Sequence, residues 1–389
     1  MKVAVIHNQP LGTREAGVAF VTGAATGYAL SGAETTLLAP GPVKNAKAEL
    51  ARLAVPDPTP FALPSLPPIR LEWGLFRPSW SGPFRKAVLG KLAAGGFDVA
   101  VVRDLKLADL LLRYDLPLKL VYEMHNLYSL GQDDARADGL FPADKLDMHR
   151  RREAMEKRVL EKVDGVIVLT VGLKKLLEPH YNLAGRIGVG GSALHPTKPP
   201  AKPARCVEIA YLGSLDPHKG VGSIVAALAE LPEETRLLLV GHGRHHEALL
   251  KLAVYYGVAE RLTLAGWYAP ADLPERLAEC FAAVVPLEDL FYNRYVTSPM
   301  KLFDYARAGV VPVIPDLPVF EELFAESGGG VIVETGTAAN YAAALRKLFE
   351  DSDYRAEKEH QLRAFAARYT WQRRGEGLLR FFTRLTAGA

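Results

Sequence analysis

Cysteine is scarce in this chain. Its 389 residues contain two, Cys206 and Cys280, which stand 74 positions apart and form no C-x-x-C pair. This spacing excludes a disulfide framework and a thiolate metal site as organising features. A D-x-D metal motif occurs only at 351–353, late in a helix-favouring region, where we interpret it as coincidence. We therefore expect a protein of the reducing cytoplasm that needs no bound metal.

A clear membrane-spanning segment is also missing. The stretch 16–33 carries no charge over 18 residues, near the lower limit for crossing a bilayer, but seven of these residues are Gly, Ser or Thr. Its apolar residues recur at steps of three and four, so we predict a buried amphipathic helix. The apolar run at 3–6 is too short for a secretory leader and is interpreted as a first strand.

A strong excess of one charge is absent as well. The formal net charge is +3, with 23% charged and 49% hydrophobic residues. So weak a basic excess gives no reason to expect a nucleic-acid partner, and the composition excludes disorder and fibres. A chain of this length is expected to form two domains.

The sequence does contain a repeated alternation of short β-branched runs and helical periods, which predicts parallel sheets with helices on both faces. The segment LHPTKPPAKPAR interrupts this pattern with four prolines and has the composition of a linker. We therefore predict an α/β protein with two doubly wound domains in tandem. The predicted parts are a first domain over 1–193, a linker over 194–205, a second domain over 206–365 and a terminal helix over 366–389.

Open parallel sheets bind ligands at the carboxyl ends of their strands, so polar residues and glycines there are candidates for a site. In the first domain, Gly12 and Gly17 belong to a loop before a helix, where backbone N–H groups could approach an anion or a sugar. A simple connecting turn explains them equally well. His125 follows a strand at 119–122, and it either hydrogen-bonds a sugar hydroxyl or is a satisfied structural residue.

In the second domain, Lys219 stands at a predicted helix start close to Gly213. An ammonium group beside free helical N–H groups suits a diphosphate, whereas a solvated surface lysine is the alternative. Gly241 and Gly243 follow the next strand, and three histidines lie within 242–246. We favour an exposed helix start over a metal site there, because no carboxylate or cysteine lies at ligand spacing.

The segment TSPMKLFDYARAG, at 297–309, contains the most informative pattern. Ser298 before Pro299 signals a helix start, so Asp304 lies about a turn and a half inside the helix. A carboxylate in this position can accept both hydroxyls of a ribose, as an acidic residue does in dinucleotide sites. An ordinary acid on a helix surface is the alternative.

Together these segments resemble the retaining GT-B glycosyltransferases of the family 4 type, also called glycosyltransferases group 1. The resemblance spans nearly the whole chain and keeps the family's order of motifs. The matching segments are AGVAFVTGAATGYALSGAETTLLAP, LKLVYEMHNLY, MEKRVLEKVDGVIVLT, YLGSLDPHKG, LLVGHGR, SPMKLFDYARAGVVPVIPDLP and ARYTWQRRGEGL. It implies the GT-B fold, in which two doubly wound Rossmann-like domains face each other across a cleft and the C-terminal helices cross back to the first domain.

The resemblance also implies roles for individual residues. Three of them are expected to be catalytic: Lys219 matches the lysine on the donor diphosphate, Asp304 the second acid of the family's motif, which holds the ribose, and His125 the histidine that faces the transferred sugar. The implied donor-binding set is Gly213, Ser214, Lys219, Gly241, Gly243, Ser298, Pro299, Met300, Lys301 and Asp304, and Gly12 and Gly17 form the acceptor or phosphate loop.

Three positions depart from the family's pattern. Asp304 is shorter than the usual Glu, Val296 stands where the first acid is expected, and Ser214 replaces the arginine that partners the lysine on the diphosphate. Lys301 and Arg294 are candidates to supply the missing cation.

The resemblance implies a cytoplasmic, metal-independent transferase without a cofactor. It would move a sugar from a nucleotide sugar, such as a UDP- or GDP-sugar, to a carbohydrate, lipid-linked or small-molecule acceptor with retention of configuration, in polysaccharide or glycoconjugate biosynthesis. A non-catalytic nucleotide-sugar-binding protein of the same fold and a sugar-nucleotide 2-epimerase type of enzyme remain alternatives. A basic helix over 145–162 leaves peripheral membrane contact open, although its acidic residues favour a solvated helix.

Overall fold

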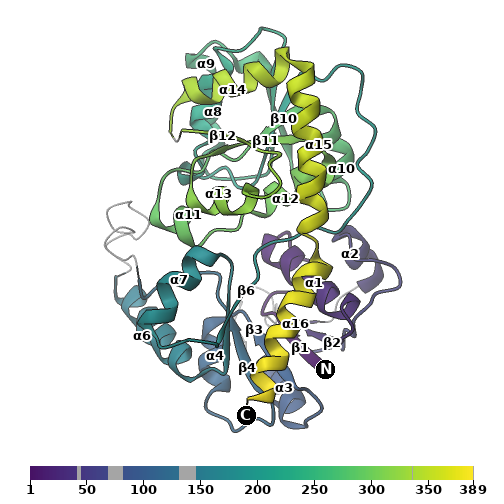
Figure 1. The fold of residues 1–389 in the computed structure, drawn as a ribbon, viewed down its shortest axis with the longest axis vertical. Coiled ribbons are helices and arrows are strands. Elements are labelled where there is room, and N and C mark those ends of the chain that lie inside the picture. Colours follow the sequence, from purple (N-terminus) through teal and green to yellow (C-terminus); the bar gives the residue numbers. More distant parts are fainter. Residues whose placement is uncertain (42–44, 69–81, 131–145, 335, 389) are drawn as a thin grey trace, which may run out of the picture. The chain divides into compact units, whose positions relative to one another are not determined.

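The chain divides into two compact units in a computed structural model that describes residues 1–41, 45–68, 82–130, 146–334 and 336–388 (Figure 1). Unit 1 comprises Met1–Ala193, Tyr295–Ser298 and Thr370–Ala389, and unit 2 comprises Leu194–Arg294 and Pro299–Tyr369. The proline-rich stretch 194–205, which we expected to be a separate linker, is therefore part of unit 2. The terminal segment joins unit 1 at Thr370 rather than at residue 366, and the short piece of unit 1 at Tyr295–Ser298 was not expected.

Unit 1 contains a six-stranded parallel sheet in the order β2-β1-β3-β4-β5-β6. The strands are β1 (Lys2–Ile6), β2 (Glu34–Leu38), β3 (Val99–Val102), β4 (Lys119–Glu123), β5 (Gly165–Val168) and β6 (Ile187–Val189). Residues 99–102 and 165–168 are buried throughout, because helices cover both faces of a doubly wound sheet and leave no polar face. The continuous apolar runs in the sequence reflect this burial.

Seven helices with described bounds belong to unit 1: α1 (Ala16–Leu30), α2 (Ala46–Arg52), α3 (Gly82–Ala93), α4 (Leu105–Leu111), α6 (Leu146–Lys162), α7 (Val171–His180) and α16 (Trp371–Ala387). Side-chain caps fix several of their starts. The Asp104 carboxylate accepts a hydrogen bond from Leu107 N at the start of α4, and the Thr170 hydroxyl accepts one from Leu173 N at the start of α7.

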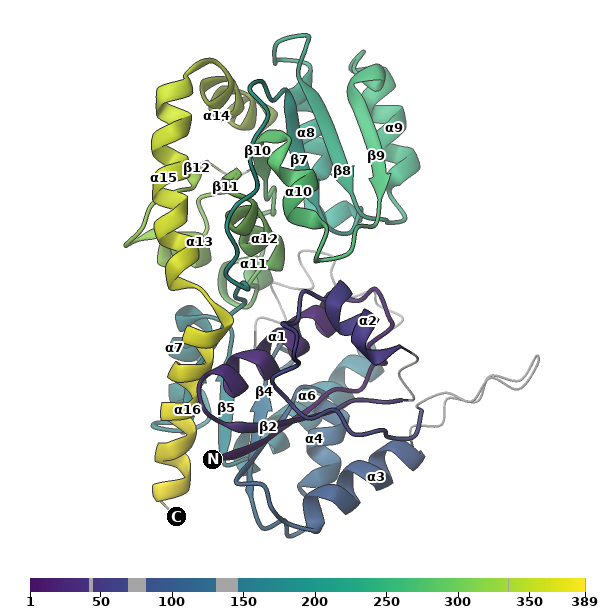
Figure 2. The ribbon, with the colours of Figure 1, turned by 90° about the vertical axis from the view of Figure 1, so that its right-hand side faces the viewer.

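The C-terminal helix α16 packs against α1 through glycines (Figure 2). A Cβ on Gly23 or Gly27 of α1 would overlap Trp371, and a Cβ on Gly375 would overlap the backbone carbonyl of Gly27. The two helices can approach this closely only because side chains are absent at these positions. The uncharged stretch thus forms a buried helix over Ala16–Leu30, but residues 20–28 are buried on every side, so the helix lacks the exposed polar face of the amphipathic helix we predicted. No helix among the described residues is long and apolar enough to cross a membrane.

Unit 2 repeats the architecture with a parallel sheet in the order β12-β11-β10-β7-β8-β9. Its strands are β7 (Glu208–Leu212), β8 (Arg236–Val240), β9 (Leu262–Gly266), β10 (Cys280–Val284), β11 (Val311–Pro315) and β12 (Val331–Val333). Its helical segments are η2 (Pro217–Lys219), α8 (Val221–Leu228), α9 (His246–Tyr255), η3 (Ala259–Arg261), α10 (Leu273–Ala278), α12 (Met300–Ala308), α13 (Pro318–Phe324), α14 (Ala338–Glu350) and α15 (Ser352–Arg368). Helix α11 (Phe291–Tyr295) ends at the first residue of the short piece of unit 1. The predicted pair of doubly wound domains is confirmed.

Candidate active site

Each sheet has one point at which the strand order reverses. In unit 1 the chain leaves β1 for β2 on one side and returns to β3 on the other, and in unit 2 β7 lies between β8 and β10 in the same way. Ligands of doubly wound sheets bind outside the carboxyl ends of the strands at this switch point. A ligand site is therefore expected at the loops after β1 and β3 in unit 1, and at those after β7 and β10 in unit 2.

In unit 1 a network of buried charged groups surrounds Glu123, whose side chain is 1% exposed. One carboxylate oxygen, Oε1, accepts a hydrogen bond from Nη2 of Arg374 on α16. The other, Oε2, lies 3.6 Å from Nε of Arg103 and 3.4 Å from Nε2 of His125. Arg374 also donates to the carbonyl oxygens of Gly190 and Gly191, at 3.2 and 2.9 Å. The network joins the ends of β3, β4 and β6 to the C-terminal helix.

These contacts fix the charge of each group. Burial alone would raise the pKa of Glu123, but Arg374, His125 and Arg103 together lower it to about 2. Burial, and then the charge of Arg103, lowers the pKa of His125 to about 4 even though Glu123 opposes the shift. At neutral pH a carboxylate therefore stands beside a neutral imidazole. The nearby His7 is neutral too, because burial, Arg103 and His125 lower its pKa to about 3.

The two glycines of the predicted acceptor or phosphate loop differ from each other. Gly12 is exposed, and a Cβ there would meet nothing within 4 Å. Gly17 lies in the first turn of α1, where a Cβ would be 3.4 to 3.6 Å from Gln9, Arg103 and His7. Of the two, Gly17 is the one that lies beside the buried charged groups.

In unit 2 two lysines meet at the switch point. Lys301, in the first turn of α12, holds its ammonium group 4.1 Å from the centre of the Tyr211 ring and 3.0 Å from where a Cβ on Gly213 would stand. Burial, and then the charge of Lys219, lowers the pKa of Lys301 to about 7. Burial lowers the pKa of Lys219 as well, although Asp216 opposes the shift. Among the described residues neither lysine has a carboxylate within 4 Å.

Helix α12 is held at this position by Tyr305. Its hydroxyl accepts a hydrogen bond from Leu212 N at 2.8 Å and donates one to Val284 O at 3.2 Å, which ties α12 to the ends of β7 and β10. Asp304 precedes this tyrosine and is half-buried. Burial raises the pKa of Asp304 to about 6, against the opposing charge of Arg307. The carboxylate is therefore ionised at neutral pH and close to titrating.

Three of the predicted donor-binding glycines have a structural reason of their own. A Cβ on Gly241 would overlap the carbonyl of Gly213, and one on Gly243 would overlap the backbone of Leu215. Gly213 and Gly241 also have φ of 138° and 141°, which side chains rarely adopt. These glycines let the loops after β7 and β8 pack backbone against backbone, so their presence is explained without a ligand.

The residues before α12 are also engaged. The Ser298 hydroxyl accepts a hydrogen bond from Ser192 N at 2.8 Å, and the Ser192 hydroxyl donates one to Ser298 O at 2.7 Å, both within unit 1. Val296 is fully buried, so the position of the family's first acid is part of the apolar packing. Arg294 forms an ion pair with Asp289, whereas Lys301 lies beside Lys219. Of the two candidates for the missing cation, Lys301 fits better.

Four residues of the unit 1 network were not among the predicted site residues. Arg103 and His7 directly follow β3 and β1, and their place at strand ends was a usable signal. Glu123 is the last residue of β4, a strand that is otherwise mostly apolar, so its pattern gave no signal of a site. Arg374 comes 251 positions later than Glu123, and nothing in the sequence pairs them.

Two other predicted features take no part in these clusters. On α6, Arg158 pairs with Asp109, Lys157 pairs with Glu153, and Arg152 lies over the Tyr128 ring, so much of its positive charge is balanced within unit 1. Lys145, the first residue of the predicted basic helix, lies outside the described residues. Near 242–246 and elsewhere in the described residues, no group of three or more His, Cys, Asp or Glu could hold a metal ion.

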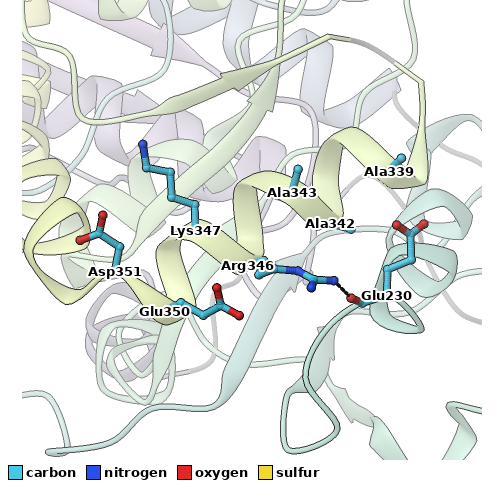
Figure 3. Close-up of a pocket in the computed structure, with 8 residues that line it drawn as sticks. All are labelled: Glu230, Ala339, Ala342, Ala343, Arg346, Lys347, Glu350 and Asp351. Atoms are coloured by element: carbon cyan, nitrogen blue, oxygen red, sulfur yellow. Dashed lines mark hydrogen bonds between the residues drawn. The ribbon is translucent and has the colours of Figure 1, made fainter.

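A groove of about 440 Å³ in unit 2 lies elsewhere (Figure 3). It is lined by Glu230, Ala339, Ala342, Ala343, Arg346, Lys347, Glu350 and Asp351, and Arg346 donates to the backbone carbonyl of Glu230. Because Glu230 follows α8 and precedes β8, the groove lies toward the amino ends of the strands. It is not at the edge where doubly wound sheets bind ligands.

Part of the chain matches the model of a known protein family. Residues 207–351 match the family model of the glycosyl transferases group 1. D-inositol 3-phosphate glycosyltransferase of Nocardia farcinica is 26% identical over 294 residues, which is 70% of this chain and 62% of that protein. Lipopolysaccharide core biosynthesis glycosyltransferase LpsE of Rhizobium meliloti is 26% identical over 41% of this chain and 45% of its own. The chain thus spans less than two thirds of the length of these relatives.

Solved structures resemble the whole chain. Sucrose-phosphate synthase from Thermosynechococcus elongatus has a TM-score of 0.73 at 17% identity, with 100% of both chains covered. Anabaena Alr3699/HepE in complex with UDP and glucose has a TM-score of 0.68 at 16% identity, over 98% of this chain and 99% of that one. WaaG, a glycosyltransferase involved in lipopolysaccharide biosynthesis, has a TM-score of 0.67 at 16% identity over 98% and 99%. The fold is that of the GT-B glycosyltransferases, and the family model and relatives support a place among the glycosyltransferases of group 1.

Proposed function

We propose that this protein is a glycosyltransferase that moves a sugar from a nucleoside diphosphate sugar to an acceptor, in polysaccharide or glycoconjugate biosynthesis. The observation that carries the proposal is the lysine pair of unit 2. Lys219 and Lys301 are neighbours at a switch point, and no described carboxylate lies within 4 Å of either ammonium group, although the charge of Asp216 partly opposes the lowered pKa of Lys219. Two adjacent cations without a direct ion-pair partner are unfavourable unless an anion binds, and a diphosphate is an anion of matching charge.

The nucleotide half of the donor would lie along α12. The first turn of this helix contains no acidic residue, and no side chain caps its start, so its backbone N–H groups can turn toward a phosphate. Asp304, deeper in the same helix, would accept the ribose hydroxyls with its carboxylate. Lys301 would take the place of the arginine that Ser214 replaces, which makes the departure from the family's pattern compatible with turnover.

The transferred sugar would face His125. Glu123 lies 3.4 Å from Nε2 of this imidazole and favours the tautomer that has its proton on that nitrogen. A neutral imidazole can hydrogen-bond a sugar hydroxyl without adding positive charge next to the ring carbon, where positive charge develops during transfer. The low pKa of His125 therefore suits this role at neutral pH.

The chemical step needs no protein nucleophile in this proposal. The bond between the anomeric carbon and the diphosphate oxygen breaks, and the acceptor hydroxyl bonds the same face of the sugar, which retains the configuration. The hydroxyl proton passes to the departing diphosphate oxygen. Lys219 and Lys301 stabilise the negative charge that grows on that oxygen, so the residues supply the cations for a route without a metal.

Donor hydrolysis measured with and without acceptors tests the proposal. We first propose a thermal-shift screen of uridine, guanosine and adenosine diphosphates and their sugars, with UDP- and GDP-sugars as the expected donors. HepE was solved with UDP and glucose, which favours the uridine nucleotide of these two. The identified donor is then incubated with carbohydrate, lipid-linked and small-molecule acceptors. Transfer with retained configuration supports the proposal. Tight donor binding without transfer or hydrolysis would contradict it and favour a non-catalytic binding protein.

A further inference from the structure

Glu156 is an acid in an apolar part of unit 1. It lies on α6, three and four positions before Val159 and Leu160, which are both fully buried, and its own side chain is 0% exposed. Residues at this spacing share one face of a helix, and the buried face of a helix is ordinarily apolar. A carboxyl group at this position therefore needs a local explanation.

The carboxyl group of Glu156 holds the loop that follows β4. Its Oε2 atom accepts hydrogen bonds from two successive backbone N–H groups, that of Tyr128 at 2.9 Å and that of Ser129 at 2.7 Å. Glu156 comes 28 positions after Tyr128, so the contact joins separate parts of the chain. One oxygen that accepts from two successive peptide groups fixes the position of both.

The same loop has a second anchor where it leaves β4. Met124 N donates a hydrogen bond to Ile167 O of β5 at 2.8 Å. His125 lies in the short segment between this anchor and Tyr128, and its ring meets the Phe20 ring edge-on, with the ring centres 4.7 Å apart. The backbone on both sides of His125 is thus held, on one side by β5 and on the other by Glu156.

The cost of burying this acid supports a role in the loop. Burial raises the pKa of Glu156 from 4.5 to about 7, although hydrogen bonds from Ser129 and Tyr128 oppose the shift. Between these two pKa values the folded protein holds more protons than the unfolded chain, so the group lowers stability as the pH rises. An apolar side chain would avoid this loss, but it would leave two backbone N–H groups without their acceptor.

The contact with the loop needs an acceptor oxygen rather than a charge. Among the described residues, Oε1 of Glu156 and the hydroxyls of Ser129 and Tyr181 have no hydrogen-bond partner of good geometry, although the Ser129 side chain lies near the other two groups. A protonated carboxyl or an amide in the place of Oε1 can donate to a hydroxyl oxygen, while the other oxygen goes on accepting from the loop.

We propose that Glu156 is a positioning residue for His125, because it fixes the far end of the loop that carries this imidazole. The inference rests on the proposed function, in which His125 faces the transferred sugar, and adds a residue that touches no substrate. A misplaced imidazole should slow the reaction more than it weakens donor binding, since the proposal assigns the nucleotide to unit 2.

NMR and hydrogen exchange on the full chain test this without a substrate. In the wild type the His125 ring, identified by comparison with His125→Gln, should not titrate between about pH 5 and 8, because its pKa is about 4. In Glu156→Ala this pKa should rise toward 6.5, since a loosened loop admits water to the ring. The amide hydrogens of Tyr128 and Ser129 should exchange about tenfold faster or more, because they lose their acceptor.

Glu156→Gln is the conservative variant. It keeps an acceptor oxygen, so it should preserve the slow exchange of the loop and the low pKa of His125. Glu161→Ala removes an exposed acid of the same helix and is the matched control, which should change neither measurement. If circular dichroism shows that Glu156→Ala does not fold, Glu156→Asp takes its place, because its carboxylate is one methylene short of the two amides.

Hydrolysis of UDP-glucose and of GDP-mannose adds a kinetic measurement. For the nucleotide sugar that the wild type hydrolyses, Glu156→Ala should lower kcat about tenfold to a hundredfold and leave KM within about twofold. Glu156→Gln should restore kcat. A variant that raises KM at unchanged kcat would contradict a role through His125.

An unchanged His125 titration in folded Glu156→Ala or Glu156→Asp would overturn the inference even if the amides exchange faster, because the far end of the loop would then not control the imidazole. Glu156→Gln that behaves like Glu156→Ala would also overturn it, since the acceptor oxygen would not be what matters. A raised His125 pKa in Glu156→Ala, in a protein whose wild type binds no nucleotide sugar, would support the positioning of His125 and contradict the proposed function.

Discussion

The two units bury charge in different ways. In unit 1, Glu123 lies between the guanidinium groups of Arg374 and Arg103, which stay protonated at any pH of interest. In unit 2, the ammonium groups of Lys219 and Lys301 are neighbours, and burial lowers both pKa values. The cluster of unit 1 therefore has a fixed charge, whereas Lys301 in unit 2, with a pKa of about 7, can change its charge near neutral pH.

The two kinds of cluster suit two different roles, namely positioning and the stabilisation of developing charge. A fixed network of guanidinium and carboxylate groups holds its members in one geometry, and in unit 1 it orients His125 through Glu123. A lysine near its pKa, as Lys301 is at neutral pH, suits a group whose negative charge grows during a reaction, because it gains a proton as that charge appears. Mutations that exchange or remove these groups test whether the unit 1 cluster has a fixed charge and the unit 2 cluster a variable one.

The largest expected effect comes from opening the unit 1 network. Arg374→Ala leaves Glu123 buried without its strongest partner, so we expect a loss of about 3–5 kcal/mol in the free energy of unfolding. Urea denaturation measures it. Arg373→Ala, an exposed neighbour on α16, is the control and should shift stability by less than about 0.5 kcal/mol. Equal effects of the two variants would show that the network does not stabilise unit 1.

A feature of this fold can be predicted from the sequence when the residues that determine it lie close together along the chain. The alternation of strands and helices is local, so both sheets could be predicted, and the prolines at 194–205 lie directly after the first stretch of unit 1. Lys301 and Asp304 are three positions apart on one short helix, so helix periodicity alone places them on the same side of α12. These features need no knowledge of tertiary packing.

The remaining features depend on packing that a single sequence does not reveal. Arg374 reaches Glu123 only because glycines let α16 approach α1. Gly241 and Gly243 match a nucleotide loop in sequence, yet their close backbone neighbours already require glycine. Ser298 was expected at the donor, but its hydroxyl bonds Ser192 in unit 1. The roles of the candidate residues toward a ligand stay predictions.

A second effect should appear in turnover. Lys219→Ala is expected to lower kcat by about a hundredfold to a thousandfold, the range for removing one group that stabilises developing negative charge. Donor affinity should fall less, since the charge on the leaving oxygen is larger in the transition state. Initial rates with the identified donor measure the effect, and Lys251→Ala, an exposed lysine of α9, is the control. A loss in donor affinity alone would contradict the assignment.

A smaller effect is expected at the ribose. Asp304→Ala should weaken binding of the nucleoside diphosphate by about 1.5 to 3 kcal/mol, the usual range for hydrogen bonds to a charged group. Calorimetry compares it with Asp272→Ala, an exposed acid of the same unit. The losses in this variant and in Lys219→Ala should persist in a chelator. Unchanged nucleotide affinity would remove the ribose assignment, and strict dependence on a divalent ion would remove the metal-independent route.

The smallest expected effect is the uptake of a proton when the donor binds. It tests directly whether the charge of the unit 2 cluster changes while that of the unit 1 cluster stays fixed. The folded pKa of Lys301 is about 7, below its ordinary value of 10.5, so between these values the free protein holds fewer protons than the unfolded chain and its stability rises with pH. A bound diphosphate favours the charged lysine and raises this pKa again. At about pH 8 donor binding should therefore take up close to one proton, and affinity should fall as the pH rises further.

Binding heats measured in two buffers of different ionisation enthalpy give the number of protons taken up. The probe is the nucleotide sugar itself, because its diphosphate has no group that titrates near neutral pH. Lys301→Met should abolish the uptake, whereas Arg103→Gln should leave it in place, since a guanidinium does not titrate in this range. Affinity should also fall below about pH 6, where Asp304 gains a proton and can no longer accept both ribose hydroxyls as a carboxylate. Proton uptake that survives in Lys301→Met would show that the lysine pair does not respond to the anion, and the contrast between the two units would then rest on geometry alone.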